Sequence, residues 1–210
     1  MQKYSLRLFA LILALGGFSS PLLAQSNTAK LDKRVQGIFQ VAMKGTCESL
    51  DPESILYPAT PEIFEIAGGG ENEDYPEGSY RLYEFYCTAG AYNFGSVYYI
   101  ANDFGEIRQA QFPFPRYDVT NETDDFESAV TGIKITGFYA YDIMINPEFD
   151  EKTKTLYTFS KWRGLADASS SGQWVFKEGR FILKSYDVDA SYDEKINPIR
   201  IYGKGKPAKY

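Results

Sequence analysis

Histidine is absent from this 210-residue sequence, and its absence limits the chemistry that the protein can perform. Imidazole is the commonest general base near neutral pH, so neither a Ser-His-Asp nor a Cys-His nucleophile can be assembled. Zinc sites built on histidine ligands are excluded for the same reason. The S-x-x-K spacing of serine–lysine enzymes is missing as well. We therefore predict no catalytic residue of these classes.

Calcium-loop spacing is also missing, although acidic residues are plentiful and give the chain a formal net charge of −6. The acidic runs Asp118–Glu127 and Asp187–Asp193 lack the D-x-[DN]-x-[DN]-G pattern of a dedicated calcium loop. We therefore predict no metal site and no cofactor. Because an acidic chain repels phosphate backbones, we also expect no nucleic-acid partner. Carboxylate pairs, as in glycoside hydrolysis, are the catalytic groups that remain.

Cysteine is scarce, with only Cys47 and Cys87 in the whole chain. In an oxidising compartment, two cysteines of a secreted protein most simply pair with each other. Neither belongs to a C-x-x-C motif or stands beside an evident activating base, so a reactive thiol is the weaker interpretation. The sequence therefore predicts a Cys47–Cys87 disulfide and no free thiol.

Long apolar runs are missing except at the N-terminus, where residues 1–24 are typical of a secretory signal peptide. Lys3 and Arg7 provide the positive start, Leu8–Leu15 the apolar stretch, and Ala24 the small residue before cleavage. The stretch is shorter than the roughly 20 residues that cross a bilayer. We therefore expect a mature protein that is periplasmic or secreted and has no membrane anchor after signal cleavage.

Alternation of side chains is most regular between Ile145 and Asp189. Thr155–Trp162 is rich in β-branched and aromatic residues at the spacing of a strand. One face would consist of Thr155, Tyr157, Phe159 and Lys161, and the other of Leu156, Thr158, Ser160 and Trp162. Gln173–Phe176 and Arg180–Tyr186 predict two more strands, joined by a tight turn that contains Gly179. Arg163–Gly172 is rich in Gly, Asp and Ser and predicts a loop. The stretch is typical of an antiparallel β-meander.

The sequence motifs of this stretch resemble those of a known family. It contains N-P-x-F-D, then L-x-x-F-S-K-x-R-G-L-x-D, then S-G-x-W-V-F-x-x-G-x-F-x-L, all between Asn146 and Tyr186. These motifs resemble the secreted bacterial family called domain of unknown function 1176. In that family a cysteine usually stands where this chain has Ala168, and a second one where it has Ala190. The resemblance implies a fold and a compartment, but no activity.

A second meander is predicted upstream from Tyr80–Cys87, Ser96–Ala101 and Ile107–Phe112, with a turn at Asn102–Gly105. Pro113 and Pro115 are expected to end this block, Tyr117–Glu127 to form an acidic loop, and Ala129–Ile145 to supply one or two further strands. Asp51–Glu77 is expected to be an extended connector, with a helical turn at Pro61–Ile66 and a flexible glycine triplet at 68–70.

The one predicted helix is Lys30–Lys44, which Gly45 would stop. Its apolar face would consist of Leu31, Val35, Ile38 and Ala42. We predict a mainly β fold, with two antiparallel meanders forming a sandwich or a barrel-like sheet, plus this N-terminal helix. Residues 1–24 would be the signal peptide and 25–210 a single β-rich domain, with 75–115 and 130–190 as candidate halves.

Three residues are candidates for ligand binding. Arg163 and Asp167 lie in the loop that carries the family motif, but an ion pair that holds this loop between the strands is the favoured interpretation. Trp174 suits a sugar platform, although a buried tryptophan on a strand more often belongs to the core. The 17 tyrosines favour an aromatic binding face, which the sequence pattern does not place.

The expected function is a non-enzymatic binding or interaction module for an envelope protein or glycan. Missing catalytic residues, a β scaffold and abundant tyrosine favour this hypothesis. The alternative is a carboxylate-dependent hydrolase of envelope glycans. A protein without enzymatic activity is the favoured interpretation, but the sequence does not exclude an enzyme. Two carboxyl groups about 5 to 9 Å apart in a cleft would favour the hydrolase, whereas a tyrosine-rich surface would favour the binding module.

Overall fold

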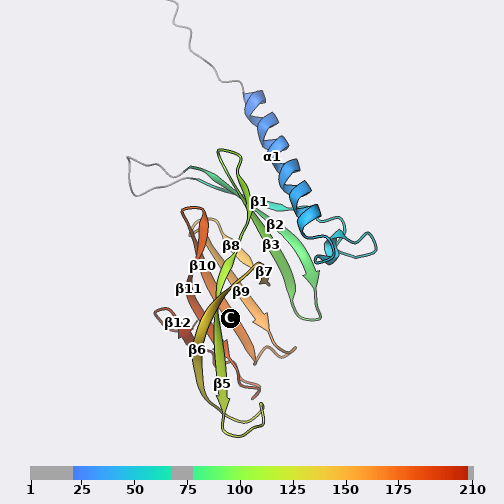
Figure 1. Ribbon diagram of the computed structural model, residues 1–210. Coiled ribbons are helices and arrows are strands. Elements are labelled where there is room, and N and C mark those ends of the chain that lie inside the picture. The colour runs from blue at the N-terminus through green and yellow to red at the C-terminus, as the bar shows by residue number, and fades with distance from the viewer. Residues whose placement is uncertain (1–20, 68–77, 208–210) are drawn as a thin grey trace, which may run out of the picture.

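Three antiparallel sheets make up most of the computed structural model, which describes residues 21–67 and 78–207. The sheets lie in sandwich-like layers, and a long helix packs against the first of them (Figure 1). The mainly β prediction is confirmed. Of the two architectures expected from the sequence, the described residues form the sandwich and not a barrel-like closed sheet.

The N-terminal sheet has the strand order β1–β2–β3–β4, with β7 also pairing with β3. The central strands β2 and β3 are buried on both faces, because one face meets the helix and the other meets the remaining sheets. All pairs are antiparallel. The bounds are β1 Glu62–Ile66, β2 Tyr80–Ala89, β3 Phe94–Asn102, β4 Ile107–Gln109 and β7 Ile143–Ile145.

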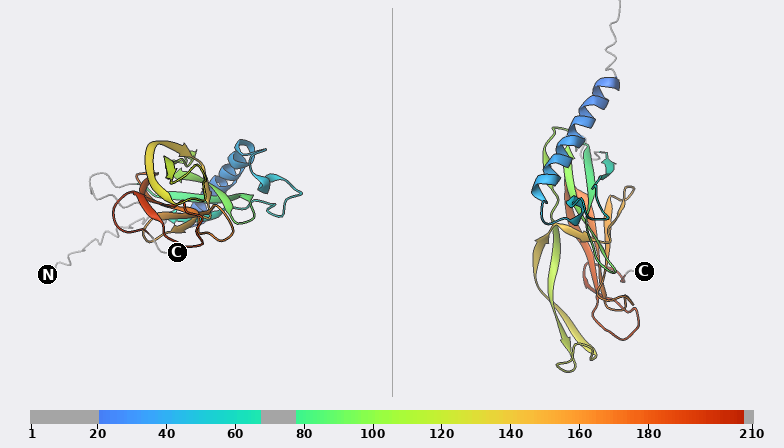
Figure 2. Two further views of the ribbon diagram at one scale, coloured as in Figure 1. Left: turned by 90° about the horizontal axis from the view of Figure 1, so that it is seen from below. Right: turned by 90° about the vertical axis from the view of Figure 1, so that its right-hand side faces the viewer.

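Helix α1 (Pro21–Ala42) covers one face of this sheet, as the right-hand view of Figure 2 shows. It buries Val35 and Phe39, whereas Ile38 is 40% exposed. The predicted apolar face was therefore wrong at Ile38 and Ala42, because packing follows an i, i+4 row through the aromatic Phe39. Gly45 has a φ of +79° and follows the helix closely. Among the described residues, no helix is both long and apolar enough to cross a membrane.

The predicted disulfide is confirmed, since Cys47 and Cys87 are bonded and no cysteine is free. It ties the chain just after α1, beside the short 3-10 helix Glu48–Leu50, to strand β2. The two cysteines are 40 residues apart in sequence, and closing such a loop stabilises the fold by about 4 kcal/mol on the chain-entropy model. Residues 1–20 lie outside the described residues, so signal cleavage after Ala24 stays a prediction.

The C-terminal sheet has the order β12–β11–β10–β9–β8 and contains the family-like motif. The turn at Glu178 and Gly179 is confirmed, because both residues have positive φ and Lys177 pairs with Arg180 across it. The bounds are β8 Glu148–Asp150, β9 Thr155–Lys161, β10 Ser169–Lys177, β11 Arg180–Asp189 and β12 Ile199–Tyr202.

A long hairpin of β5 (Phe112–Asn121) and β6 (Val130–Tyr141) lies over the C-terminal sheet (Figure 2). The predicted second meander does end before Pro113 and Pro115, since β4 ends at Gln109, but both prolines lie within the next strand, β5, which was not predicted from the sequence. Proline is tolerated there because β5 pairs with β6 on one side only. The acidic loop predicted at Tyr117–Glu127 is shorter than expected, since β5 continues to Asn121.

Two further segments differ from the sequence prediction. The expected helical turn at Pro61–Ile66 is largely strand β1, which pairs with β2 and buries Ile66. The expected loop Arg163–Gly172 is too long, because Ser169–Gly172 pairs with β9 despite weak strand propensity. Tertiary pairing outweighs local preference at both places. The glycine triplet at 68–70 lies outside the described residues.

Two apolar cores result from this layering. The smaller one lies between α1 and the N-terminal sheet and contains Phe39, Phe85 and the disulfide. The larger one contains residues of all three sheets and surrounds the fully buried Trp174. Because the N-terminal sheet contributes its two faces to different cores, it forms the layer between α1 and the other two sheets.

Candidate functional site

An aromatic cleft of about 280 Å³ opens between the β5–β6 hairpin and the C-terminal sheet, beside β7. We call this hollow the aromatic cleft. None of its lining side chains carries a formal charge at neutral pH. The lining residues are Phe114, Tyr117, Tyr139, Tyr141, Ile143, Ile145, Thr158, Ser160, Trp162, Ser170 and Tyr186.

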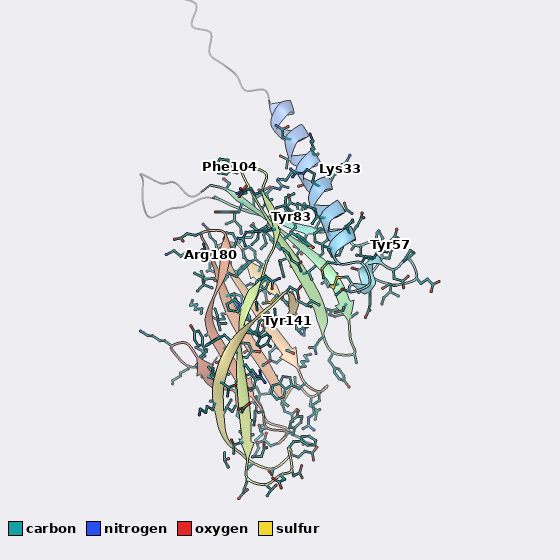
Figure 3. The ribbon with its side chains drawn as sticks, in the orientation of Figure 1. Lys33, Tyr57, Tyr83, Phe104, Tyr141 and Arg180 are labelled. Carbon is teal, nitrogen blue, oxygen red and sulfur yellow. A yellow bond between two sulfur atoms is a disulfide. The ribbon has the colours of Figure 1, made fainter. Side chains whose placement is uncertain are left out.

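The hairpin supplies the first wall of the cleft. Phe114 on β5 and Tyr139 on β6 are cross-strand partners, and their rings stack with centroids 5.9 Å apart. Tyr141 follows two residues later on the same face of β6 and packs edge-on against Phe114. Tyr139 and Tyr141 are 49% and 40% exposed, so each ring keeps a free surface. Figure 3 shows Tyr141 where the hairpin reaches the upper strands.

The C-terminal sheet supplies the floor and the second wall. Thr158 and Ser160 lie on one face of β9, because side chains two apart on a strand point the same way, and Trp162, directly after the strand, also lines the cleft. Ser160 pairs with Ser170 on β10, so small hydroxyl side chains lie side by side under the hairpin. Their small volume leaves the depth of the cleft, and the larger Trp162 bounds it at one end.

Trp174 and Gly172 hold the hairpin at its distance from the floor. A Cβ on Gly172 would lie 2.1 Å from Cη2 of Trp174, so the indole lies flat over the glycine. Trp174 Nε1 donates a 2.9 Å hydrogen bond to the carbonyl oxygen of Pro113 on β5. The ring also packs against Phe114, with centroids 4.7 Å apart. Trp174 therefore forms the closed end of the gap between hairpin and sheet.

Two asparagines join the layers beside the cleft. The Asn146 amide nitrogen donates to Asn93 Oδ1 and to the carbonyl oxygen of Phe159, both at 2.8 Å. The amide nitrogen of Asn93 in turn donates to the carbonyl oxygen of Lys161 at 2.8 Å. Asn146 has a φ of +43°, which asparagine tolerates better than most residues. These hydrogen bonds fix the end of β9, which Trp162 directly follows, against the start of β3.

Burial keeps the phenols of the cleft protonated. Desolvation raises the pKa of Tyr186 to about 12, although its hydrogen bond with Ser170 opposes the rise. Desolvation also raises the pKa of Tyr117 and of Tyr139. These phenols therefore stay neutral at physiological pH and act as hydrogen-bond donors and acceptors.

Arg163 and Asp167, the first two sequence candidates, form an ion pair within their loop. Arg163 Nε donates to Asp167 Oδ1 at 2.8 Å, and Nη2 contacts the other carboxylate oxygen. This pairing holds the pKa of Asp167 far below its usual range, and backbone N–H bonds from Glu194 and Ala168 add to the effect. The guanidinium lies 5.2 Å from the ring centre of Tyr192. Neither residue lines the aromatic cleft.

Trp174, the third sequence candidate, is fully buried. It lies behind the cleft wall and contacts Phe114 and Tyr186, whose rings do line the cleft. Trp174 therefore lies in the sheet that forms the cleft floor, but it does not line the cleft.

A second hollow, of about 390 Å³, lies between the hairpin loop and the segment after β11, and it contains the carboxylates Glu127, Asp189 and Asp193. Asp189 is 3% exposed, and both of its oxygens accept hydrogen bonds within its loop, from Ser191 and Asn197. Its carboxylate therefore organises the loop. Within the described residues, no group of three or more Cys, Asp and Glu side chains is placed to hold a metal ion.

Residues of the cleft were missed because they come from separate strands. Tyr139 and Tyr141 alternate on β6, which is the one local signal that these rings share a face. These two rings and Trp162, which directly follows β9, line one cleft only because the hairpin folds back over the sheet. A general expectation of a tyrosine-rich face was thus the furthest that the sequence pattern reached.

Comparison with known proteins adds a family but no activity. The family model described as "Protein of unknown function (DUF1176)" matches residues 77–191. A similar protein, "Uncharacterized protein YpfG" of Escherichia coli (strain K12), is 28% identical over 116 residues, which cover 53% of this chain and 28% of that protein. The match thus spans little more than a quarter of the relative's length. No solved structure matches the chain.

Proposed function

We propose that this chain, which belongs to the DUF1176 family of proteins of unknown function, is a non-enzymatic binding module whose aromatic cleft takes up a neutral ligand. The observation that carries the proposal is the lining of the cleft, which combines aromatic rings with hydroxyl groups and contains no charged side chain. Ligand sites are typically concave and aromatic, with a few polar groups that fix orientation.

The composition of the cleft favours binding over catalysis. General acid–base chemistry needs a group that exchanges protons near the working pH. The phenols are the titratable groups in the lining, and burial moves the pKa of Tyr186 to about 12, away from that range. Backbone or hydroxyl groups orient a ligand without transferring its protons.

The alternative, a carboxylate-dependent hydrolase of envelope glycans, finds no support at the cleft, where no lining residue is Asp or Glu. The acidic hollow beside the hairpin loop does hold carboxylates, but the Asp189 carboxylate is committed to backbone N–H and hydroxyl donors. A carboxyl held in this way is poorly placed to protonate a leaving group. The binding module is therefore the better-supported function.

The proposed compartment is the periplasm or the cell exterior. The Cys47–Cys87 disulfide is the kind of bond that persists in oxidising compartments, and residues 1–24 have the pattern of a signal peptide. The proposed ligand is accordingly an envelope component. Both points would be tested by fractionating the native host and determining the N-terminal residue of the mature protein.

Nuclear magnetic resonance provides the test of ligand uptake. The two tryptophans give two indole N–H signals, of which Trp162 lines the cleft and Trp174 is buried. The protein is titrated with the neutral probes cyclohexanol, p-cresol and methyl β-glucoside. We expect at least one of them to shift the Trp162 signal. The charged probes benzoate and benzylamine should leave it in place, because the cleft holds no counter-ion.

Paired variants make this test specific. Replacing Tyr139 and Tyr141 by alanine removes two partly exposed rings of the cleft wall and should abolish the shifts. Phe138→Ala is the matched control, since Phe138 is 54% exposed on the same strand but does not line the cleft. Shifts that survive in the double variant, or no shift with any neutral probe, would refute the proposed function.

A further inference from the structure

We infer that the ligand of the aromatic cleft is an uncharged pyranose unit of a glycan. This inference rests on the proposed function and narrows it to one chemical class. A pyranose presents apolar C–H faces above and below its ring and hydroxyl groups around its edge. A matching site needs flat aromatic surfaces on its sides and neutral groups that both donate and accept hydrogen bonds at its floor.

The side walls meet the first requirement. Tyr139 and Tyr141 leave about half or somewhat less of their surface open to the cleft and solvent, and Trp162 lines the cleft from its position directly after β9 of the C-terminal sheet. Aromatic rings of this kind bury large apolar areas while their polar ends stay hydrated. The volume of about 280 Å³ lies at the lower end of the range for ligand pockets, which suits a single ring.

The floor meets the second requirement. Thr158 and Ser170 are 5% and 7% exposed, and with Ser160 they place three hydroxyl groups on one face of β9 and β10. A hydroxyl donates one hydrogen bond and accepts two, as does each hydroxyl group of a sugar. Ser170 already bonds with Tyr186, but the hydroxyl groups keep further donor and acceptor positions that a sugar can use and an entirely apolar ligand cannot.

Charged ligands fit the cleft poorly. No Lys, Arg, Asp or Glu lines it, and the raised pKa of Tyr117, Tyr139 and Tyr186 keeps their phenols neutral. A carboxylate, phosphate or ammonium group would lose its hydration there without gaining a counter-ion. Uronic acids, phosphorylated sugars and free amino sugars are therefore disfavoured relative to neutral hexoses and N-acetylated sugars.

An extended peptide added to the sheet edge also fits poorly. Strand β5 borders the cleft and pairs with β6 on one side, so its other edge is where a peptide would add. Pro113 and Pro115 have no N–H to offer at this edge, and the Pro113 carbonyl already accepts the Trp174 indole N–H. Prolines on an edge strand block pairing with a further strand. The groove is thus closed to β-augmentation over this part of β5.

Titration with defined oligosaccharides tests the inference. The probes are cellotriose, maltotriose and N,N′,N″-triacetylchitotriose, with trigalacturonic acid as the charged counterpart and a neutral Ser/Thr-rich decapeptide as the peptide probe. We expect at least one neutral trisaccharide to shift the Trp162 indole signal and to bind with a measurable heat. Trigalacturonic acid and the peptide should do neither.

Single ring deletions give the expected size of the effect. Tyr141→Ala should weaken binding of the responding trisaccharide about tenfold, which corresponds to about 1.4 kcal/mol, whereas Phe138→Ala should leave it unchanged. If cyclohexanol or p-cresol binds in the cleft and no trisaccharide does, the inference fails while the proposed function stands. If the peptide or the charged sugar binds best, the inference is overturned. If no neutral probe of either set binds, both fail.

Discussion

At the scale of single residues, the contact between Gly172 and Trp174 decides how the larger core closes. The indole occupies the space that any other side chain at position 172 would need, and it hydrogen-bonds to the hairpin from there. The backbone angle of this glycine is not in the left-handed region. The requirement for glycine is therefore one of space alone, and it couples the core to the hairpin.

Replacing Gly172 by alanine should destabilise the protein by about 3 kcal/mol, because a buried and well-packed tryptophan has to move. Gly137→Ala, on β6, is the matched control, since nothing lies within 4 Å of the added Cβ. Urea denaturation of both variants measures the difference in free energy of unfolding. Equal stabilities of the two variants would show that Trp174 adjusts freely and that the contact has little importance.

Glu84 is a second residue whose position lowers the stability of the fold. It is 8% exposed, and burial raises its pKa, with the hydroxyls of Ser96 and Tyr98 opposing the rise and Glu62 adding to it. Glu62 is its direct partner across β1 and β2, so two carboxylates face each other in one row of the sheet. Like charges in this position destabilise a strand pair.

A raised carboxyl pKa in the folded state means that folding favours the protonated form. The resulting stability is complete below the unfolded pKa, near 4.5, and is lost as the pH rises through the folded pKa. Glu84→Gln should therefore raise the melting temperature at pH 7 and change it little at pH 4. Thermal denaturation at both values measures this, with the exposed Glu148→Gln as control. A variant that is less stable than the native protein at pH 7 would contradict the assignment.

At the scale of elements, the ladder between β10 and β11 places Ala168 opposite Ala190. Ser169 pairs with Asp189, and one further step along an antiparallel ladder joins the two alanines. Both are buried, at 0% and 6% exposure. Facing residues of an antiparallel pair have Cα atoms about 4.5 to 5.5 Å apart, within the range that a disulfide spans.

Replacing Ala168 and Ala190 together by cysteine should produce a second disulfide and stabilise the protein by about 3 kcal/mol, given the loop of roughly 20 residues that it closes. Mass spectrometry without reduction detects the bond, and denaturation with and without reductant measures its effect. Ala168→Cys alone is the control and should gain no stability. Two free thiols in the oxidised double variant would mean that the two positions do not face each other as the register requires.

Elements with strong local patterns were predictable. Thr155–Lys161 and Arg180–Asp189 are strands because their alternating side chains suit a sheet with one buried face, and the two-residue turn between β10 and β11 follows from its glycine. Pro113 and Pro115 misled the prediction for a physical reason. Proline excludes a central strand but not an edge strand, and which strand lies at an edge is decided by the whole topology.

Strand β1 and the helix face show the same limit. Glu62–Ile66 is short and acidic, and it becomes a strand because β2 offers it an edge to pair with. On α1, Phe39 is buried instead of Ile38 because the ring stacks on Phe85 with centroids 4.1 Å apart. Neither partner is near in sequence. The cleft shows the same limit, because its aromatic rings come from β5, β6, β11 and from Trp162 directly after β9, and they meet only in the folded chain.

At the scale of the whole molecule, the N-terminal sheet separates two cores that are stabilised by different interactions. The core under α1 is stabilised by the Cys47–Cys87 disulfide as well as by packing. The larger core contains no cysteine, and its aromatic residues interlock through Trp174, Phe112 and Phe181. The aromatic cleft borders mainly this larger core and contains no residue of α1, although Ile143 in its lining packs against the core under the helix.

Removal of the disulfide should therefore act on one layer more than on the other. Replacing Cys47 and Cys87 by alanine should lower the free energy of unfolding by about 4 kcal/mol through the freed loop. Hydrogen exchange followed by mass spectrometry should show the largest loss of protection in α1, with β10 and β11 changed less. Reduced native protein is the control and should behave like the variant.

Ligand uptake provides the independent readout of this layered arrangement. Because the cleft lining contains no residue of α1 and reaches the core under that helix only through Ile143, the cysteine-free variant should keep its probe-induced shift of the Trp162 signal under conditions where it stays folded. Uniform loss of protection in all layers, together with loss of that shift, would show that the disulfide stabilises both cores as one cooperative unit.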